Sequence, residues 1–339
     1  LVRQSPKVED TRCLRMADTR HSFLSGMAFA GLRVRARRLS LLQRPSVPWL
    51  VAVLIVLAVG TLSLSWFDPG AYITPTDLAY PFSPSSDLYD HVFTWDGRYS
   101  RESVPGLMRA FPYLSSVAFA DWVGIGPIGA ERLLFYFLFT FPGLAMVYLV
   151  RVAYGRDSAL AALVAALFYM MNPLTLLVKW NAFPPALFTY GMMPLILGIY
   201  VTAIRRHSFF KYPLLFGAAS LFGVSAVTIS YFVVAAMPII GYLLFFVLVN
   251  HRRPRVVANA GGVTMAIGIS FLIFNLYWIL PFYSILGTRA SIMLEGSAEY
   301  NLSAFKLESQ DMSLLNILRA QGYWGFFKGQ GGKPYYPFA

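Results

Sequence analysis

The sequence is poor in charge and almost without cysteine. Only 13% of its 339 residues are charged and 57% are hydrophobic, whereas charged residues make up about a quarter of an ordinary soluble domain. We therefore exclude a water-soluble globule. The single cysteine, Cys13, excludes an internal disulfide, and without a cysteine pair or a histidine cluster no structural zinc site is expected. The nucleophile-elbow, zinc-protease and phosphate-loop patterns are also missing, which leaves hydrolase and ATPase functions without support.

Long apolar runs dominate the chain instead. Each is long enough to cross roughly 30 Å of hydrocarbon as a helix, so we expect an all-α polytopic membrane protein with about seven transmembrane helices. The expected spans are 47–67, 132–152, 158–178, 184–204, 210–227, 230–250 and 256–282. Proline interrupts several of them, at Asn172-Pro173, Pro194, Pro238 and Pro281, which a membrane tolerates only where protein or trapped water satisfies the freed backbone groups.

The basic residues indicate how the chain is oriented. They collect in residues 1–46 and in every second connection between the apolar runs. If the chain threads back and forth, one side carries 18 basic and 4 acidic residues (net +14) and the other carries 10 and 12 (net −2), which agrees with the total of +12. Because positive loops stay in the cytoplasm, we expect a multi-pass plasma-membrane protein with a cytoplasmic N-terminus. The positive charge then contacts anionic membrane lipids, and no nucleic-acid partner is expected.

Three regions follow from this orientation. Residues 1–46 are a basic cytoplasmic arm, and residues 47–282 form the transmembrane domain, which includes a large first outer loop at 68–131. Residues 283–339 form a second outer segment that we expect to be cut short before a further helix. The first outer loop holds eight of the sixteen acidic residues, so the candidate catalytic carboxylates are concentrated there.

The first outer loop is expected to carry amphipathic helices that lie along the membrane surface. Ser86 can cap a helix whose first turn contains Asp87, and one face of this helix would carry Leu88, Val92 and Trp95. A second helix is expected at 105–123. It is rich in the aromatic residues typical of interfacial segments, namely Phe111, Tyr113, Phe119 and Trp122.

One pattern in this loop could bind a metal. Asp87, Asp90 and His91 have the i, i+3, i+4 spacing of one helix face and are weak candidates for a divalent-ion site. The simpler interpretation is a capped and solvated helix face. We therefore expect no metal site and no certain cofactor, and a divalent cation stays an open possibility.

Asp77 is the loop carboxylate best suited to catalysis. It follows the first expected span by about ten residues, in the sequence Thr-Asp-Leu-Ala-Tyr-Pro-Phe-Ser-Pro at 76–84, whose aromatic and proline residues can partly desolvate it. A carboxylate held so close to the headgroups can accept a proton from a hydroxyl, as a general base must. The alternative interpretation is a loop aspartate that caps a turn.

The order of several motifs resembles a known family. These are the 76–84 segment, Thr94-Trp-Asp96, Glu131-Arg-Leu-Leu-Phe-Tyr, Tyr169-Met-Met-Asn-Pro173 and Asn275-Leu-Tyr-Trp-Ile-Leu-Pro281. Over residues 47–339 the chain is similar to the GT-C class of polyprenyl-phosphate-sugar-dependent glycosyltransferases, and more narrowly to the membrane part of the arabinofuranosyltransferase-like proteins.

The resemblance implies an enzyme that moves a sugar from a polyprenyl-phosphate donor to a hydroxyl of a glycan or glycolipid at the outer face, with inversion at the anomeric carbon. It implies that Asp77 is the first-loop catalytic aspartate, with Asp68 the competing choice and Asp96 the third.

Cationic side chains are the natural partners of the departing lipid phosphate. The candidates are Arg98, Arg101 and Lys179. Trp180 and Asn181 lie beside the break at Asn172-Pro173, where they could line a cavity open to the outer leaflet. We therefore regard both as substrate-binding candidates.

Two other functions remain open at this point. A transporter or lipid-carrier flippase would use the breaks at Asn172-Pro173 and Pro194 as a translocation path, but transport predicts ionisable residues buried in mid-membrane, and the apolar runs contain almost none. A non-catalytic scaffold for cell-envelope assembly is the third interpretation.

Overall fold

The computed structural model describes residues 47–73, 80–81, 83–93, 95–96, 101–102, 107–108, 110–155, 158–173, 175–176, 186–223, 229–309 and 313–315. The chain divides into two compact units, Leu1–Leu50 and Val51–Ala339. Of the first unit only residues 47–50 are described, and they form the first turn of helix α2. The expected basic arm, residues 1–46, lies outside the described residues.

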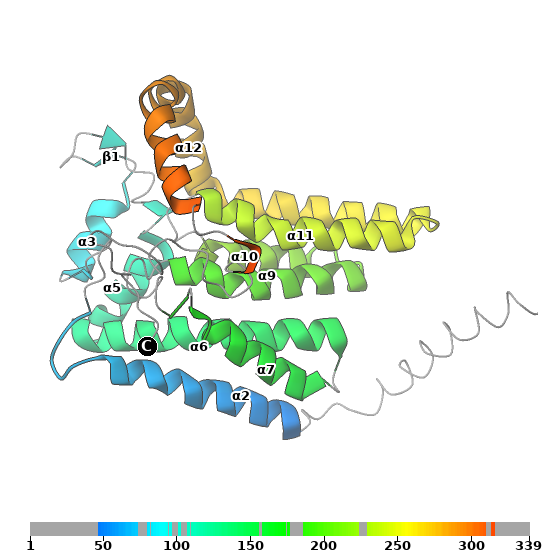
Figure 1. Ribbon diagram of the computed structural model, residues 1–339, viewed down its shortest axis with the longest axis horizontal. Coiled ribbons are helices and arrows are strands. Elements are labelled where there is room, and N and C mark those ends of the chain that lie inside the picture. The colour runs from blue at the N-terminus through cyan, green and yellow to red at the C-terminus, as the bar shows by residue number, and fades with distance from the viewer. Residues whose placement is uncertain are drawn as a thin grey trace, which may run out of the picture. The chain divides into compact units, whose positions relative to one another are not determined.

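The described part of the second unit is almost entirely helical (Figure 1). Its helical elements are α2 (Val47–Gly60, from Val51 on), η1 (Thr61–Trp66), α3 (Pro84–His91), η2 (Ala110–Leu114), α5 (Ser115–Trp122), α6 (Pro127–Tyr154), α7 (Ala159–Met170), α9 (Ala186–Arg206), α10 (Lys211–Gly223), α11 (Ile229–Asn250) and α12 (Pro254–Ser309). The strands in the described residues are β1 (Trp95–Asp96) and β2 (Arg101–Glu102), which pair antiparallel over two residues each. The all-α prediction is confirmed.

Five described helices are long and apolar enough to cross a membrane. They are Pro48–Trp66, Pro127–Tyr154, Ala186–Arg206, Val233–Asn250 and Pro254–Tyr283, so the protein is a membrane protein. In the other two expected spans the described helices are shorter, 12 residues in α7 and 13 in α10, and the count of seven stays a prediction. Helix α7 ends early because Asn172 precedes Pro173, and a residue before proline is disfavoured in the helical conformation.

Helix directions place the polar connections at two opposite ends of the bundle. Helices α6 and α9 run parallel, because Phe137 packs against Phe188 near their starts and Arg205 bonds to the backbone carbonyls of Val152 and Ala153 near their ends. Figure 1 shows α6 and α9 side by side along this direction. We call the end where α6 and α9 finish the basic end, and the end where they begin the loop end.

Helices α10 and α12 share the opposite direction. The Thr189 hydroxyl at the start of α9 donates to the Gly223 carbonyl at the end of α10. Further along, the Asn275 amide of α12 donates to the Ser220 hydroxyl of α10 at 2.8 Å. Because both helices start at the basic end, the arginines around them lie there too. The basic end therefore collects Arg151, Arg205, Arg206, Lys211, Arg252, Arg253 and Arg255, and the first outer loop belongs to the loop end.

Glycines bring α6 and α9 into close contact. A Cβ atom at Gly191 would lie 2.8 Å from the Phe141 ring, and one at Gly198 would lie 2.6 Å from the Tyr148 ring. The two glycines are seven residues apart and so share one face of α9. Small residues at such contacts allow membrane helices to pack closely without a hydrophobic driving force. The two rings therefore fit over the glycines and fix how the two helices are aligned along their axes.

The first outer loop differs in detail from the prediction. Helix α3 begins at Pro84, because proline is well suited to the first helical position. Ser83 is the N-cap residue, and its side chain makes no capping bond. The expectation that Ser86 caps this helix is wrong, since Ser86 lies inside the first turn. The helix ends at His91, so Trp95 is not on its face and belongs to β1 instead.

The C-terminal boundary of the last expected span also differs. Helix α12 continues as one element of 56 residues from Pro254 to Ser309, past the expected boundary at residue 282. Pro281 lies inside it, since proline costs a helix one hydrogen bond but has a helical φ angle. At least the first part of the expected second outer segment, up to Ser309, is therefore helical.

Candidate functional site

The first turns of α6 organise the loop end. Glu131 is fully buried, with 0% of its surface exposed. Its two carboxylate oxygens accept the backbone N–H of Ile73 at 3.2 and 3.3 Å. A buried carboxyl group is costly unless it is hydrogen-bonded. This one therefore ties the chain that follows the first membrane helix to the start of α6.

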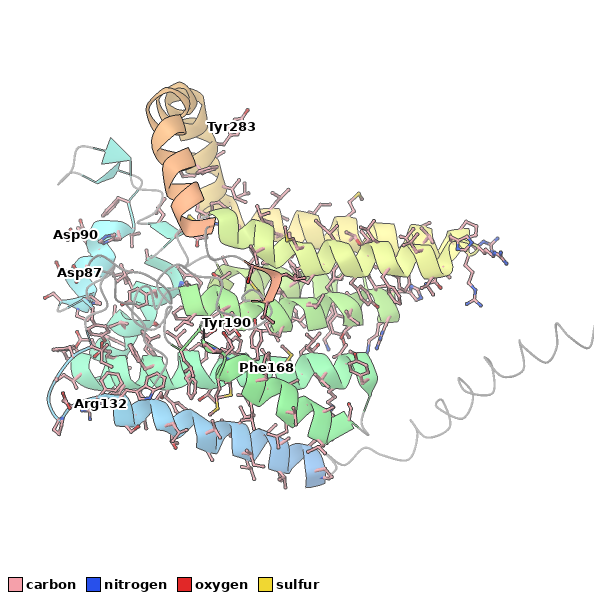
Figure 2. The ribbon with its side chains drawn as sticks, viewed as in Figure 1. Asp87, Asp90, Arg132, Phe168, Tyr190 and Tyr283 are labelled. Carbon is pink, nitrogen blue, oxygen red and sulfur yellow. The ribbon has the colours of Figure 1, made fainter. Side chains whose placement is uncertain are left out.

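The neighbouring Arg132 holds the same stretch slightly earlier. Its Nη2 donates to the backbone carbonyl of Asp68 at 3.2 Å, and its guanidinium lies over the Phe67 ring at 5.6 Å from the centroid. Figure 2 shows Arg132 on α6 at the loop end, close to the end of α2 and η1. Asp68, the second choice for the catalytic base, is exposed. Its backbone carbonyl is therefore hydrogen-bonded to Arg132, while the residue itself is exposed.

Tyr80, which follows Asp77 in the sequence, is also hydrogen-bonded to the start of α6. Its hydroxyl donates to the Pro127 carbonyl at 3.0 Å and its ring stacks on Tyr72 at 5.5 Å, with 2% of the residue exposed. Burial, together with the nearby Glu131 carboxyl, raises the pKa of the Tyr80 hydroxyl, so it remains a proton donor at neutral pH. The chain is thus attached to α6 at Ile73 and again at Tyr80, and Asp77 belongs to the intervening residues 74–79, outside the described residues.

A second set of hydrogen bonds surrounds the break at Asn172-Pro173. The rings of Tyr169 and Tyr190 stack at 4.1 Å, and each hydroxyl donates to the backbone carbonyl of the other residue, at 2.9 and 2.6 Å. The Asn172 amide donates to the Tyr190 hydroxyl at 2.7 Å, and its oxygen accepts the N–H and hydroxyl of Thr175 at 3.0 Å each. These bonds satisfy the polar groups that the helix break frees.

Residues of this cluster come before and after the stretch that contains the predicted substrate-binding residues Lys179, Trp180 and Asn181. Thr175 precedes this stretch and Tyr190 follows it, and the three predicted residues lie outside the described residues. Figure 2 shows Tyr190 beside the end of α7. The expected cavity beside these residues stays a prediction, since the break itself is closed by direct hydrogen bonds.

Because α6 and α9 are parallel, the start of α9, which follows the segment with Lys179, lies at nearly the same level of the bundle as Glu131, which bonds to the segment before Asp77. Phe137 meets Phe188 with ring centroids 6.0 Å apart, so Ala186, the first residue of α9, is level with Phe135 of α6. Phe135 is four residues, or roughly 6 Å along the axis, from Glu131. The segment that contains Lys179 therefore enters α9 within about one helical turn of the level of Glu131.

Helix α12 contributes a further buried polar group at this end. Asn275 is fully buried and donates to the Ser220 hydroxyl and to the Phe271 carbonyl, while its oxygen accepts the Trp278 ring N–H at 3.0 Å. Trp278 packs with Met108 of the first outer loop. The loop is therefore packed against α12 as well as attached to α6.

The remaining predicted residues lie on the smaller elements of the loop. Asp96 and Arg101 are Cα partners in the antiparallel pair of β1 and β2, so the backbone register places the third choice for the base opposite one candidate phosphate ligand. Arg98, between them, lies outside the described residues. In α3, the Nδ1 of His91 lies 2.7 Å from the backbone carbonyl of Asp87, and Figure 2 shows Asp87 and Asp90 on this helix. Within the described residues no group of three histidine, cysteine, aspartate or glutamate side chains could hold a metal ion.

The structural roles of three residues of this site were not predicted from the sequence. Glu131 was named as a loop carboxylate and within a motif, Tyr80 only as one of the aromatic neighbours of Asp77, and Tyr190 was not singled out. For Glu131 a signal existed, because an ionisable residue at the start of a membrane-length run is costly and therefore informative. For the two tyrosines none existed, since their contacts join segments far apart in sequence.

Comparison of the chain with protein-family models, with curated proteins and with solved structures finds no match. The resemblance to glycosyltransferases therefore rests on the order of the motifs. In the structure three of these motifs contain hydrogen-bonded polar groups, through the buried Glu131 and Asn275 and the partly buried Asn172.

Proposed function

We propose that this protein is a membrane glycosyltransferase of the GT-C type. It transfers a sugar from a polyprenyl-phosphate donor to a hydroxyl of a glycan or glycolipid acceptor at the outer face of the plasma membrane. The observation that carries this proposal is the pair of attachments on α6: Ile73 to Glu131 and Tyr80 to Pro127, on the two sides of Asp77. A general base must be held within reach of its substrate, and these attachments restrict the segment that contains Asp77.

Chain length limits how far Asp77 can be from this anchor. Asp77 is three residues from Tyr80, and an extended chain covers at most about 3.6 Å per residue. The Cα atom of Asp77 is therefore within roughly 11 Å of the Cα atom of Tyr80. This radius contains the start of α6, close to where the membrane surface is expected.

In the proposed reaction Asp77 removes the proton of the acceptor hydroxyl. The acceptor oxygen forms a bond to C1 of the sugar from the face opposite the phosphate, the bond from C1 to the phosphate oxygen breaks, and the configuration at C1 inverts. The polyprenyl phosphate leaves with the bonding electron pair. Its charge is neutralised by Arg98, Arg101 or Lys179, since preorganised cations stabilise charge that develops in a transition state. Trp180 and Asn181 contact the donor, and whether a divalent cation takes part remains open.

The arrangement of charge supports the proposed sidedness. The arginines of the helix connections collect at the basic end, and the acidic first loop is at the opposite end. With the N-terminus in the cytoplasm, as the positive-inside rule predicts, the loop end faces outward. The donor then reaches the site through the bilayer, so no nucleotide-binding domain is required.

The transporter alternative finds less support. Within the described spans the ionisable residues lie near the helix ends, such as Glu131, Arg132 and Arg151 in α6 and Arg205 in α9. Transport of a charged carrier predicts such residues in mid-membrane. A scaffold without catalysis predicts no dependence on any loop carboxylate, so the experiment below addresses it.

The test replaces Asp77 by Asn and measures sugar transfer from a lipid-linked donor in isolated membranes, with and without a chelator. Loss of a general base lowers the rate about 10²- to 10⁴-fold, and we expect a loss in this range. Asp68→Asn and Asp96→Asn test the second and third choices, and Asp121→Asn on α5, a first-loop aspartate with no proposed role, is the matched control that should keep full activity. Unchanged transfer by Asp77→Asn would remove Asp77 from the role of base.

A further inference from the structure

The C-terminal end of α5 exposes a group of large apolar side chains. The exposed fraction is 62% for Phe119, 79% for Trp122, 47% for Val123 and 44% for Ile125. The two aromatic rings lie 5.9 Å apart. We call these four residues the α5 tip. The tip is distinct from the other aromatic residues of the expected interfacial segment, because Tyr113 is buried and Phe111 packs against Phe222 of α10.

A short turn closes the C-terminal end of α5 and leads directly into α6. The backbone N–H groups of Val123, Gly124 and Ile125 donate to the carbonyls of Phe119, Asp121 and Ala120 at 2.9–3.1 Å. Gly124 and Gly126 have φ angles of +84° and +73°, which glycine adopts at no steric cost. The turn between the helices is therefore short and well defined, and the position of α6 in the membrane determines the position of the tip.

The charges of α6 indicate the depth at which the tip lies. Between Arg132 and Arg151 the helix carries no charged residue over about 18 residues, or roughly 27 Å, which is close to the thickness of the hydrocarbon core. Pro127, the first residue of α6, precedes Arg132 by five residues, or roughly 8 Å. The α5 tip directly precedes Pro127 in the chain, so this spacing is consistent with a tip at the level of the lipid headgroups.

The tip is continuous with the lipid-facing side of α6. The Ile125 side chain covers Gly129, where a Cβ atom would lie 2.7 Å from it. The next residues on the same helix face are Leu133 and Phe137, four and eight positions further on, and both are exposed. An apolar strip thus runs without a break from the tip down the side of a membrane-spanning helix.

From these observations we infer that the α5 tip inserts into the headgroup layer of the leaflet at the loop end. Tryptophan and other aromatic side chains concentrate at this depth, where apolar acyl chains meet the polar headgroups. The partner of this surface is the lipid bilayer itself. Because only a short turn separates α5 from α6, the depth of the tip and the depth of the first turns of α6, with Glu131, are fixed together relative to the membrane surface. The inference holds whether or not the protein transfers sugars.

The experiment measures the depth of a nitroxide at the tip. The protein, with Cys13→Ser as background, is reconstituted in phosphatidylcholine vesicles and spin-labelled at Phe119→Cys or at Trp122→Cys, so that each variant keeps the other ring. Collisions with oxygen, which dissolves among acyl chains, are compared with collisions with a water-soluble nickel chelate. Ser86→Cys, an exposed position on α3, is the water-facing control. We expect several-fold fewer nickel collisions and more oxygen collisions at both tip positions than at Ser86.

Two results would overturn the inference. Equal nickel collisions at the tip and at Ser86 would show that the tip faces water. Exclusion of both reagents at the tip would show that a protein, such as a second copy of this chain, covers it. If the aromatic variants do not fold, Val123→Cys keeps both rings and is read by the same two criteria.

Discussion

The loop end and the basic end of the bundle treat polar groups in opposite ways. At the loop end Glu131 and Asn275 are fully buried, and each is matched to a specific partner. At the basic end Arg205 and Arg206 are exposed, and Arg205 bonds to carbonyls at the end of α6 that water could also reach. Burying a polar group costs free energy unless it is hydrogen-bonded. Specific interactions are therefore concentrated at the loop end, whereas the basic end needs only its charge.

The first prediction separates the two ends by membrane side. In a Cys13→Ser background, Ser86→Cys marks the loop end and His251→Cys marks the basic end, and both positions are exposed. If the basic end is cytoplasmic, an impermeant maleimide added to intact cells labels position 86 fully and position 251 not at all. Permeabilised cells are the control, in which both should react. Labelling of position 251 alone in intact cells would reverse the orientation and end the proposal of an outer-face enzyme.

The second prediction concerns the buried carboxyl group of the loop end. Glu131→Leu keeps the approximate size of the side chain but leaves the Ile73 N–H without an acceptor. An unpaired buried donor costs about 1–3 kcal/mol, and we expect the free energy of unfolding to fall by about 2 kcal/mol in a denaturant titration of the purified protein. Glu131→Gln retains an amide oxygen and should lose less than half as much. Equal losses in the two variants would mean that the bond to Ile73 is not what Glu131 contributes.

The third prediction concerns the tyrosine pair at the helix break. Tyr190→Phe removes a hydroxyl that donates to Tyr169 and accepts from Asn172, while the stacked rings remain. We expect a loss of about 1 kcal/mol in the free energy of unfolding. Tyr148→Phe is the matched control, since its hydroxyl makes a single long contact of 3.4 Å with Thr202 and should lose clearly less. A larger effect at Tyr148 would contradict the importance assigned to the break.

The smallest effect is expected at the basic end. Arg205→Ala removes bonds to Val152 and Ala153, but the carbonyls remain accessible to water. Surface substitutions of this kind usually change stability by less than about 0.5 kcal/mol, and the same titration should show no more than that. A loss as large as that of Glu131→Leu would remove the contrast between the two ends.

Much of the fold was predictable because membrane helices are encoded locally. An apolar run must form a helix to satisfy its own backbone, and five of the expected spans contain helices of membrane length. The ends of helices were less predictable. Ser83 rather than Ser86 is the N-cap residue of α3, and α12 continues past Pro281, because these boundaries depend on packing as well as on local residue type.

The candidate site was predictable only in part. The motifs that contain Glu131, Asn172 and Asn275 were noticed in the sequence, and each forms hydrogen bonds within the structure. Their partners could not be predicted, because Ile73 and Glu131 are 58 residues apart and Ser220 and Asn275 are 55 apart. Asp77 itself, and the cations proposed to bind phosphate, stay predictions.

The close fit of Gly191 and Gly198 beneath the Phe141 and Tyr148 rings has a mechanical consequence. With two rings seated two turns apart, α6 and α9 cannot slide along each other without lifting both rings out of their positions. We therefore expect α6 and α9 to move together as one unit. A transporter that alternates between two conformations would then have to move its other helices relative to this pair.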